Sequence, residues 1–214
     1  MKQIYTVLIC FFCLSCAMDK ELQLAEIQHS EITQVLDVSP AYVFYNTREK
    51  DSVELNKQNL ISTTNWLVNV DKRLTLQQAI PVILELQEKK RNASHKKEGV
   101  KNYFTAFNPE VKNLRFIEFT NVNYNLDQAV EDYVKTSKEQ PEVLTFGLDG
   151  AHFQNKKYTV EALVEELKSK IDQRHIFVLN FENQLSFQTY MHIKDLLLTI
   201  TNASVLINTS EFIF

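Results

Sequence analysis

The sequence predicts an α+β fold, and three observations lead to this prediction. Short segments rich in β-branched and aromatic residues, typical of strands, recur along the chain, and stretches with helical periodicity separate them. In the last third the predicted order is β-β-α-β-α-β, which suits two helices packed on one face of a small sheet. Hydrophobic residues make up 44% of the 214 residues, so a packed core is expected.

The first sixteen residues predict an export signal. Lys2 is followed by an apolar run over residues 4–14, about the length of a signal-peptide core. This run is too short to span a bilayer, which needs about 20 apolar residues in a helix. The ending Leu14-Ser15-Cys16 resembles the lipobox of bacterial lipoproteins. The resemblance implies that residues 1–15 are removed and that Cys16 is lipidated as the new N-terminus; a secreted protein cut elsewhere is the alternative.

Composition excludes several classes of site. All three cysteines, Cys10, Cys13 and Cys16, lie in the signal segment, so their regular spacing predicts no metal site and the remaining chain can form no disulfide. Removal of Lys2 leaves 22 basic and 27 acidic residues, a net charge of −5, which argues against nucleic acid as a partner. Only three glycines are present, too few at the required positions for a phosphate loop, dinucleotide fingerprint or nucleophile elbow.

Residues 16–38 are predicted as a tether, and residues 39–140 as an α+β domain. Strands are expected at residues 41–45, 52–56, 66–70, 103–107 and 114–120, and helices at residues 76–89, after a Thr75 N-cap, and 126–138. Residues 89–101 are strongly basic. A solvated loop is one interpretation of them, and a patch for acidic headgroups or another anion is the second.

Residues 141–214 are predicted as a second α+β domain. Its expected elements are a strand at residues 143–146, an Asp149-Gly150 hairpin, a helix capped by Thr159, a strand at residues 176–181, a helix capped by Ser186 and a strand at residues 205–207.

This second domain resembles the periplasmic domain of the ExbD/TolR family of biopolymer-transport proteins. The resemblance rests on residues 146–150, 155–163, 178–182 and 185–187. It implies partners among envelope energy-transduction proteins or peptidoglycan. The family also has a transmembrane helix with a proton-handling aspartate, and no such helix is predicted here, so proton coupling is not carried over.

The sequence also contains a candidate internal repeat. Residues 66–77 align without gaps with residues 177–188, with identities at Asn69/Asn180, Leu74/Leu185 and Gln77/Gln188. Duplication, which would make an internal pseudo-dimer, is one interpretation; chance similarity between two strand–turn–helix units is the other. The region before Trp66 has no clear counterpart of the helix after Thr159, which argues against a full second copy.

Candidate chemistry is sparse, and no catalytic, cofactor-binding or metal-binding residue is assigned. Asp71 and Glu182 occupy matching turns of the candidate repeat and would serve acid–base chemistry only by facing one cleft, so a role in the turns is expected. No pair of histidines has metal-binding helical spacing. The histidines are His29, His95, His152, His175 and His192.

These observations predict a lipoprotein of the bacterial cell envelope, on the periplasmic or outer-membrane side. Its expected function is that of a non-enzymatic binding or scaffolding module, accessory to ExbD/TolR-type transport, acting as a homodimer or an internal pseudo-dimer. The alternatives are an envelope hydrolase and a small-ligand carrier with a cleft between the two halves.

Overall fold

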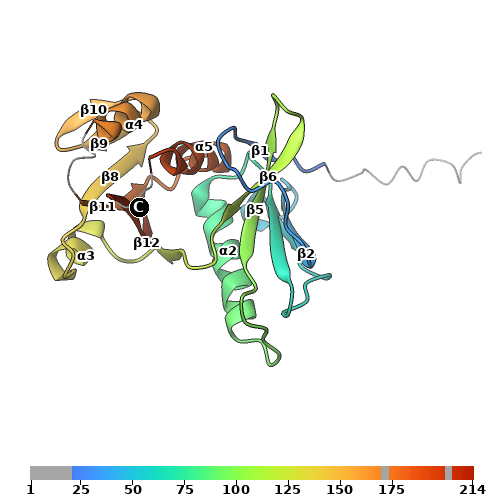
Figure 1. Cartoon of the computed structure of the whole chain (residues 1–214). Coiled ribbons are helices and arrows are strands. Elements are labelled where there is room, and N and C mark those ends of the chain that lie inside the picture. The colour runs from blue at the N-terminus through green and yellow to red at the C-terminus, as the bar shows by residue number, and fades with distance from the viewer. Residues whose placement is uncertain (1–20, 170–173, 201–203) are drawn as a thin grey trace, which may run out of the picture.

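The computed structural model describes residues 21–169, 174–200 and 204–214, which form two mixed β-sheets with helices between and beside them (Figure 1). The predicted α+β class is confirmed. Cys16 and the predicted signal peptide lie outside the described residues. Within the described part of the chain, no helix combines the length and the hydropathy that crossing a membrane requires.

The first sheet has the strand order β1-β5-β4-β2-β3. Strand β6 also pairs with β5 and lies outside this order. Strands β2, β4 and β5 are parallel, β3 runs antiparallel to β2, and β6 runs antiparallel to β5. Helix α2 connects β4 to β5. The bounds are β1 Ala25–Glu26, β2 Val38–Tyr45, the short 3-10 helix η2 Lys50–Ser52, β3 Val53–Asn56, β4 Asn65–Val70, α2 Leu76–Arg91, β5 Asn102–Asn108 and β6 Asn113–Glu118.

The second sheet has the order β10-β9-β8-β11-β12-β7. Strands β8, β11, β12 and β7 are parallel, and β9 and β10 form antiparallel hairpins beside β8. The bounds are β7 Asn123–Asn125, α3 Val130–Thr136, β8 Glu142–Gly147, β9 Gly150–Phe153, β10 Lys156–Tyr158, α4 Val160–Lys168, β11 His175–Phe181, α5 Phe187–Leu198 and β12 Val205–Ile213.

Local sequence signals act in the second sheet as expected. Gly150 has φ +130° at the end of the β8–β9 turn, a conformation that glycine adopts without strain. The Thr159 hydroxyl accepts a hydrogen bond from the Ala162 N–H at 3.2 Å, and the Ser186 hydroxyl accepts one from the Thr189 N–H at 3.1 Å. Both side chains thereby satisfy amides that the first helical turn leaves unpaired.

The described part of the predicted tether is packed against the folded body. Strand β1 pairs with β5, and the neighbouring Ile27 is 2% exposed. The buried carboxylate of Asp195 on α5 accepts hydrogen bonds from the backbone N–H groups of Gln28, His29 and Ser30 at 2.8–2.9 Å. The part of the predicted tether around residues 25–30 therefore differs from a free tether, because the side chains of Ala25 and Ile27 and the amides of residues 28–30 find partners in the folded body, whereas Leu36 stays exposed.

The predicted boundary between the halves also differs from the structure. Strand β7 lies within the range assigned to the first domain, but it pairs with β12 of the second sheet. Helix α3 begins at Val130, later than the predicted residue 126, because residues 126–129 form a bend between β7 and the helix. The second sheet thus recruits residues from before the predicted linker.

The two sheets share a strand arrangement. The order β3-β2-β4-β5 matches β9-β8-β11-β12 in both neighbours and directions, and α2 and α5 occupy equivalent crossovers. Residues 57–64 between β3 and β4, all described, form no helix, whereas α4 precedes β11. This shared topology accompanies the candidate repeat, but duplication itself stays a prediction.

The starts of α2 and α5 hydrogen-bond to each other in a reciprocal pattern. The Leu76 N–H donates to the Leu185 carbonyl at 2.9 Å, and the Phe187 N–H donates to the Leu74 carbonyl at 2.7 Å. The offset of 111 residues that carries Trp66 onto Phe177 relates the two bonds: it carries the donor Leu76 onto Phe187 and, in reverse, the acceptor Leu185 onto Leu74. A second pair, from Gln77 to Asn183 at 2.9 Å and from Gln188 to Lys72 at 3.1 Å, obeys the same offset. The contact is therefore two-fold symmetric in its backbone.

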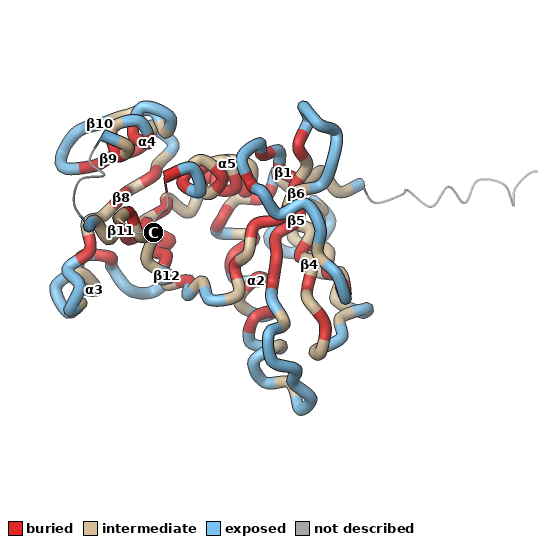
Figure 2. The backbone as a smooth tube through the Cα atoms, viewed as in Figure 1, coloured by how far each residue is buried: buried red, intermediate tan, exposed pale blue. Residues whose placement is uncertain are grey.

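A common aromatic core joins the sheets. Figure 1 shows α2 and α5 in the middle of the molecule, with one sheet on either side. The ring of Phe104 in β5 lies 5.2 Å from that of Phe187, and the ring of Phe181 in β11 lies 5.1 Å from that of Tyr190. Buried positions accordingly run along both sheets and α5 (Figure 2). The halves thus pack as one body.

Candidate anion-binding pocket

A cavity of about 750 Å³ lies at the C-terminal end of α2. Its walls come from the last turns of α2, the loop that follows, the start of β5, the β6–β7 connection and β12. The cavity therefore lies where the first half of the chain meets the second sheet. Its volume falls in the range of about 300–1,000 Å³ typical of small-molecule sites.

Basic side chains form one end of the cavity. The last turn of α2 contains Lys89, Lys90 and Arg91, a position where the helix dipole favours cations. No aspartate or glutamate is among the described residues that line the cavity. The basic segment is mostly exposed, as a solvated loop would be, and part of it also forms this wall. The basic lining residues are Lys90, Arg91, Lys96 and Lys97.

Lys90 is the most constrained of these cations. Its Nζ donates to the Lys101 carbonyl at 3.0 Å and to Asn102 Oδ1 at 2.8 Å, and it lies 5.1 Å from the centroid of the Trp66 ring. Burial lowers the pKa of Lys90 from 10.5 to about 8. Among the described residues no carboxylate forms an ion pair with Lys90, so neutral dipoles and a ring face are its partners.

The other cations differ in their partners. Lys97 forms an ion pair with Asp37 at 3.0 Å across an exposed surface. Within the described part of the chain, neither Arg91 nor Lys96 forms an ion pair with a carboxylate. The cavity therefore presents positive charge that the protein itself leaves partly uncompensated.

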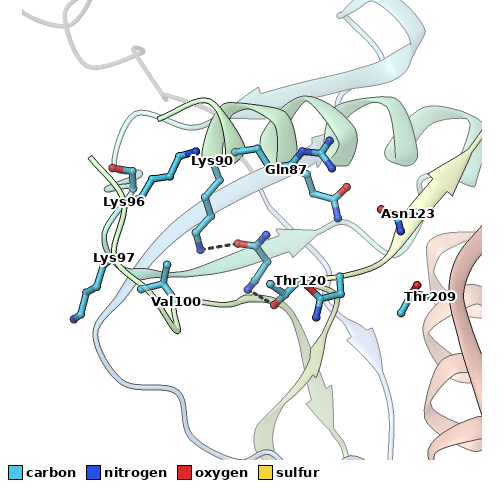
Figure 3. A pocket seen from close by; sticks show the side chains of 12 residues that line it. Gln87, Lys90, Lys96, Lys97, Val100, Thr120, Asn123 and Thr209 are labelled. Carbon is cyan, nitrogen blue, oxygen red and sulfur yellow. Dashed lines mark hydrogen bonds between the residues drawn. The ribbon is translucent and has the colours of Figure 1, made fainter. Parts of the chain in front are cut away.

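Neutral polar side chains form the rest of the wall. Figure 3 shows Lys96 and Lys97 toward one end of the cavity and Asn123 and Thr209 toward the other, with Lys90 and Gln87 between them. The further amide and hydroxyl residues of the lining are Ser62, Asn102, Thr120 and Asn121. The charge thus changes along the cavity from cationic to neutral.

Gln87 has an unpaired acceptor. It is 4% exposed, and its Nε2 donates to the carbonyls of Val122 at 3.0 Å and Phe119 at 3.3 Å. Its Oε1 is buried and has no hydrogen-bond partner among the described residues. A flipped amide would place Oε1 against two carbonyl oxygens, so the network determines the orientation. A buried acceptor left unpaired costs about 1–3 kcal/mol.

The two carboxylates predicted to occupy matching turns have separate local partners. Burial by itself would raise the pKa of Asp71, but hydrogen bonds from the Arg73 side chain and backbone outweigh it and lower that pKa. The Arg73 guanidinium lies 2.6 Å from the Asp71 carboxylate, and Glu182 accepts the Leu148 N–H at 2.8 Å. Neither carboxylate lines the basic cavity. Asp71 and Glu182 thus each stabilise their own turn.

The histidines are dispersed. His152, His175 and His192 each pair with a different carboxylate, those of Asp149, Glu142 and Glu161. Among the described residues no three histidine, cysteine, aspartate or glutamate side chains gather as metal ligands would.

A buried polar cluster was not predicted. The Tyr190 hydroxyl donates to Glu211 Oε2 at 2.8 Å and lies 3.1 Å from the Tyr124 hydroxyl, while Lys194 forms an ion pair with Glu211. Burial raises the pKa of both tyrosines well above 10. The cluster joins β7, α5 and β12 and lines no part of the basic cavity. Its residues are too widely spaced in the chain for a local pattern to reveal it.

Comparison with known proteins adds no relative: no family model, curated protein or solved structure matches this chain. The ExbD/TolR resemblance therefore stays a prediction, and function is argued from the site.

Proposed function

We propose that this chain is a non-enzymatic, membrane-tethered module of the cell envelope that binds an anionic ligand. The observation that supports this proposal most is the lining of the cavity, which combines four basic side chains with no carboxylate. Lipidated Cys16 would supply the tether, because several acyl chains hold a protein on a membrane where one does not.

Physical chemistry favours an anion at this position. Hydrogen bonds between a cation and an anion are about twice as strong as neutral ones. Attraction between charges also grows as water is excluded, and Lys90 is already partly withdrawn from water. An anion would compensate Lys90, Arg91 and Lys96 together, which the protein's own carboxylates do not do.

Fluorescence of Trp66 provides a direct test. Trp66 is the chain's one tryptophan, and its ring lies beside Lys90, so an anion bound at Lys90 will change its emission. The full chain in a non-ionic detergent is titrated with sulfate at constant ionic strength. We expect saturable binding that the double variant Arg91→Gln/Lys96→Gln weakens about tenfold or more, consistent with the loss of two charge-assisted contacts.

Lys89→Gln is the matched control. Lys89 belongs to the same last turn of α2 but is exposed and does not line the cavity. Its loss should change affinity less than about threefold, through long-range screening alone. Equal losses in the control and the double variant would contradict a pocket and indicate diffuse surface charge.

The tether has its own test. A Cys16→Ala chain should take up no labelled palmitate and should leave the membrane fraction, whereas wild type should be labelled and sediment with membranes. Labelling of Cys16→Ala would overturn the lipoprotein proposal.

A scaffolding role accessory to ExbD/TolR-type transport is the second proposal. It rests on the sequence resemblance in residues 146–187 and on the β-α-β-α-β succession of β10, α4, β11, α5 and β12. Cross-linking in membranes should then capture envelope transport proteins or peptidoglycan. Repeated capture of neither would rule out this role and leave anion binding untouched.

The alternative of a hydrolase has less support. Ser62 is the serine in the cavity lining, and its hydroxyl donates to the His95 backbone carbonyl at 2.7 Å. A serine nucleophile needs an adjacent base that accepts its proton, and a backbone carbonyl is not such a base.

A further inference from the structure

We infer that the cavity binds a small hydroxylated molecule with one anionic group, such as a phosphorylated or carboxylated polyol, in preference to a free inorganic anion. This inference rests on the proposed anion-binding function and adds the chemistry of the remainder of the ligand. Three features of the cavity support it: the gradient of charge, the unpaired acceptor of Gln87 and the volume.

The charge of the lining changes along the cavity, so the ligand that fits it best has one anionic end and one neutral, polar end. Lys96 and Lys97 lie toward one end and Asn123 and Thr209 toward the other (Figure 3). A phosphate or carboxylate suits the cationic end. Asparagine and threonine side chains both donate and accept hydrogen bonds, and such groups match hydroxyls, which do the same.

Gln87 adds a specific requirement for a donor. Its Nε2 is held by the Phe119 and Val122 carbonyls, so Oε1 is the atom left over, and it has no partner among the described residues. A fully ionised anion offers acceptors alone and cannot pair with Oε1. A ligand hydroxyl can donate to it, after a small movement that opens this buried atom to the cavity.

Volume and position favour a ligand larger than a single ion. A cavity of about 750 Å³ is far larger than a phosphate and is typical of sites for whole organic molecules. Asn123 belongs to β7 and Thr209 to β12, whereas the cations belong to α2 and its following loop. A ligand that reaches both ends therefore touches both halves of the chain.

The test compares matched probes on the full chain by isothermal calorimetry and Trp66 emission. The probes are sorbitol 6-phosphate, inorganic phosphate, sorbitol and gluconate. We expect sorbitol 6-phosphate to bind at least tenfold more tightly than phosphate, and sorbitol to bind too weakly to measure. Gluconate identifies whether a carboxylate replaces the phosphate.

The possible outcomes separate this inference from the proposed function. Equal affinity for phosphate and sorbitol 6-phosphate overturns the polyol inference but leaves anion binding intact. Failure of every anion to bind overturns both. Binding of sorbitol as tight as that of its phosphate overturns the requirement for an anionic end.

Variants at the neutral end test the same point within the protein. Thr209→Val and Asn123→Ala alter exposed residues. Each should lower the affinity for sorbitol 6-phosphate toward the affinity for phosphate. The affinity for phosphate itself should not change. Ser210→Ala is the matched control, because successive residues of a strand face opposite sides and Ser210 does not line the cavity.

Gln87→Met tests the acceptor while keeping the length of the side chain. It should weaken sorbitol 6-phosphate at least threefold and leave the affinity for sulfate, which carries no hydrogen-bond donor, unchanged. Equal weakening of both probes would show that Oε1 does not discriminate between them, and would overturn its role. The exposed Thr209 and Asn123 variants keep the inference testable if Gln87→Met folds poorly.

Discussion

The two strand–turn–helix units of this protein share a backbone contact but differ completely where their helices end. Helix α2 has 16 residues and ends in Lys89, Lys90 and Arg91, whereas α5 has 12 residues and ends in three leucines. With the offset of 111, Gln87 in the basic cavity corresponds to Leu198. Leu198 lines a different cavity of about 620 Å³, whose walls combine apolar side chains such as Phe116 with the carboxylates of Glu31 and Glu118 and, among the described residues, include no lysine or arginine. Equivalent places in one topology thus differ in charge.

The comparison teaches that the fold and the candidate site follow from different residues. The reciprocal hydrogen bonds at the helix starts depend on backbone groups, which tolerate many side chains. The charge of the cavity depends on side chains in the last helical turn and the loop after it, where substitution changes little of the core. Function can therefore diverge at helix ends while the shared core stays intact.

The largest expected effect concerns the shared core. Leu76 and Phe187 occupy equivalent helix starts, and both are fully buried. Leu76→Ala or Phe187→Ala should destabilise the chain by about 2–5 kcal/mol through lost burial and a new cavity. Urea unfolding followed by circular dichroism should show one cooperative transition in each case. Two separate transitions, one of them unshifted, would contradict a common core; Phe187→Leu is the milder variant if Phe187→Ala does not fold.

A smaller loss is expected where the halves differ. Asp195 of α5 accepts three backbone amides from residues 28–30, and its counterpart in α2 is Leu84. Asp195→Ala should cost about 3 kcal/mol, because it leaves three backbone donors unpaired, of which that of Ser30 is buried. Hydrogen exchange should accelerate at the amides of Gln28, His29 and Ser30 before the rest of the chain. Unchanged protection at these amides would show that the segment is held by other contacts.

The basic cavity should respond to pH. Because burial lowers the pKa of Lys90 to about 8, its charge is present below pH 8 and disappears as pH rises through that value. Sulfate keeps its charge over this range, so its affinity should fall up to about tenfold between pH 8 and pH 9. Lys90→Arg keeps the charge and should remove the fall. A sulfate affinity of the wild type that does not change between pH 8 and pH 9 would show that the charge of Lys90 does not contribute to anion binding.

The smallest effect compares the two helix caps. Thr75 and Ser186 are equivalent under the same offset, and their backbones form an isolated antiparallel β-bridge. Thr75→Ala and Ser186→Ala should each destabilise the chain by about 1 kcal/mol, the usual loss for a helix N-cap. Denaturation midpoints provide the measurement. A large difference between the two losses would show that the turns are equivalent in backbone alone.

Much of the secondary structure was predictable because its signals are local. The N-caps, the Gly150 turn and the apolar periodicities depend on neighbouring residues, and most strands and helices of residues 41–118 and 142–213 follow them. The short strands β1, β7 and β10 were missed since two or three residues cannot show a period of two. All three exist because an edge of a sheet offers them partners.

The candidate site was predictable only in part. The basic composition of residues 89–101 indicated an anion patch as one alternative. Gln87 gave no signal, because a glutamine within a helical pattern does not reveal whether it is buried. Asn123 and Thr209 also gave none, since they reach the cavity that Lys90 lines only through a sheet that brings distant segments together.

By itself the sequence determined the α+β class, most elements, the alignment of residues 66–77 with 177–188, and the positive charge at the end of α2, because these depend on local periodicity and composition. Tertiary structure alone decided that two similar units meet through reciprocal hydrogen bonds, that residues 28–30 are bound by Asp195, and that a cationic and a neutral wall enclose one cavity. These features depend on contacts between residues about 30 to 170 positions apart, which form only when the common core buries enough apolar surface to offset the entropy of ordering the chain.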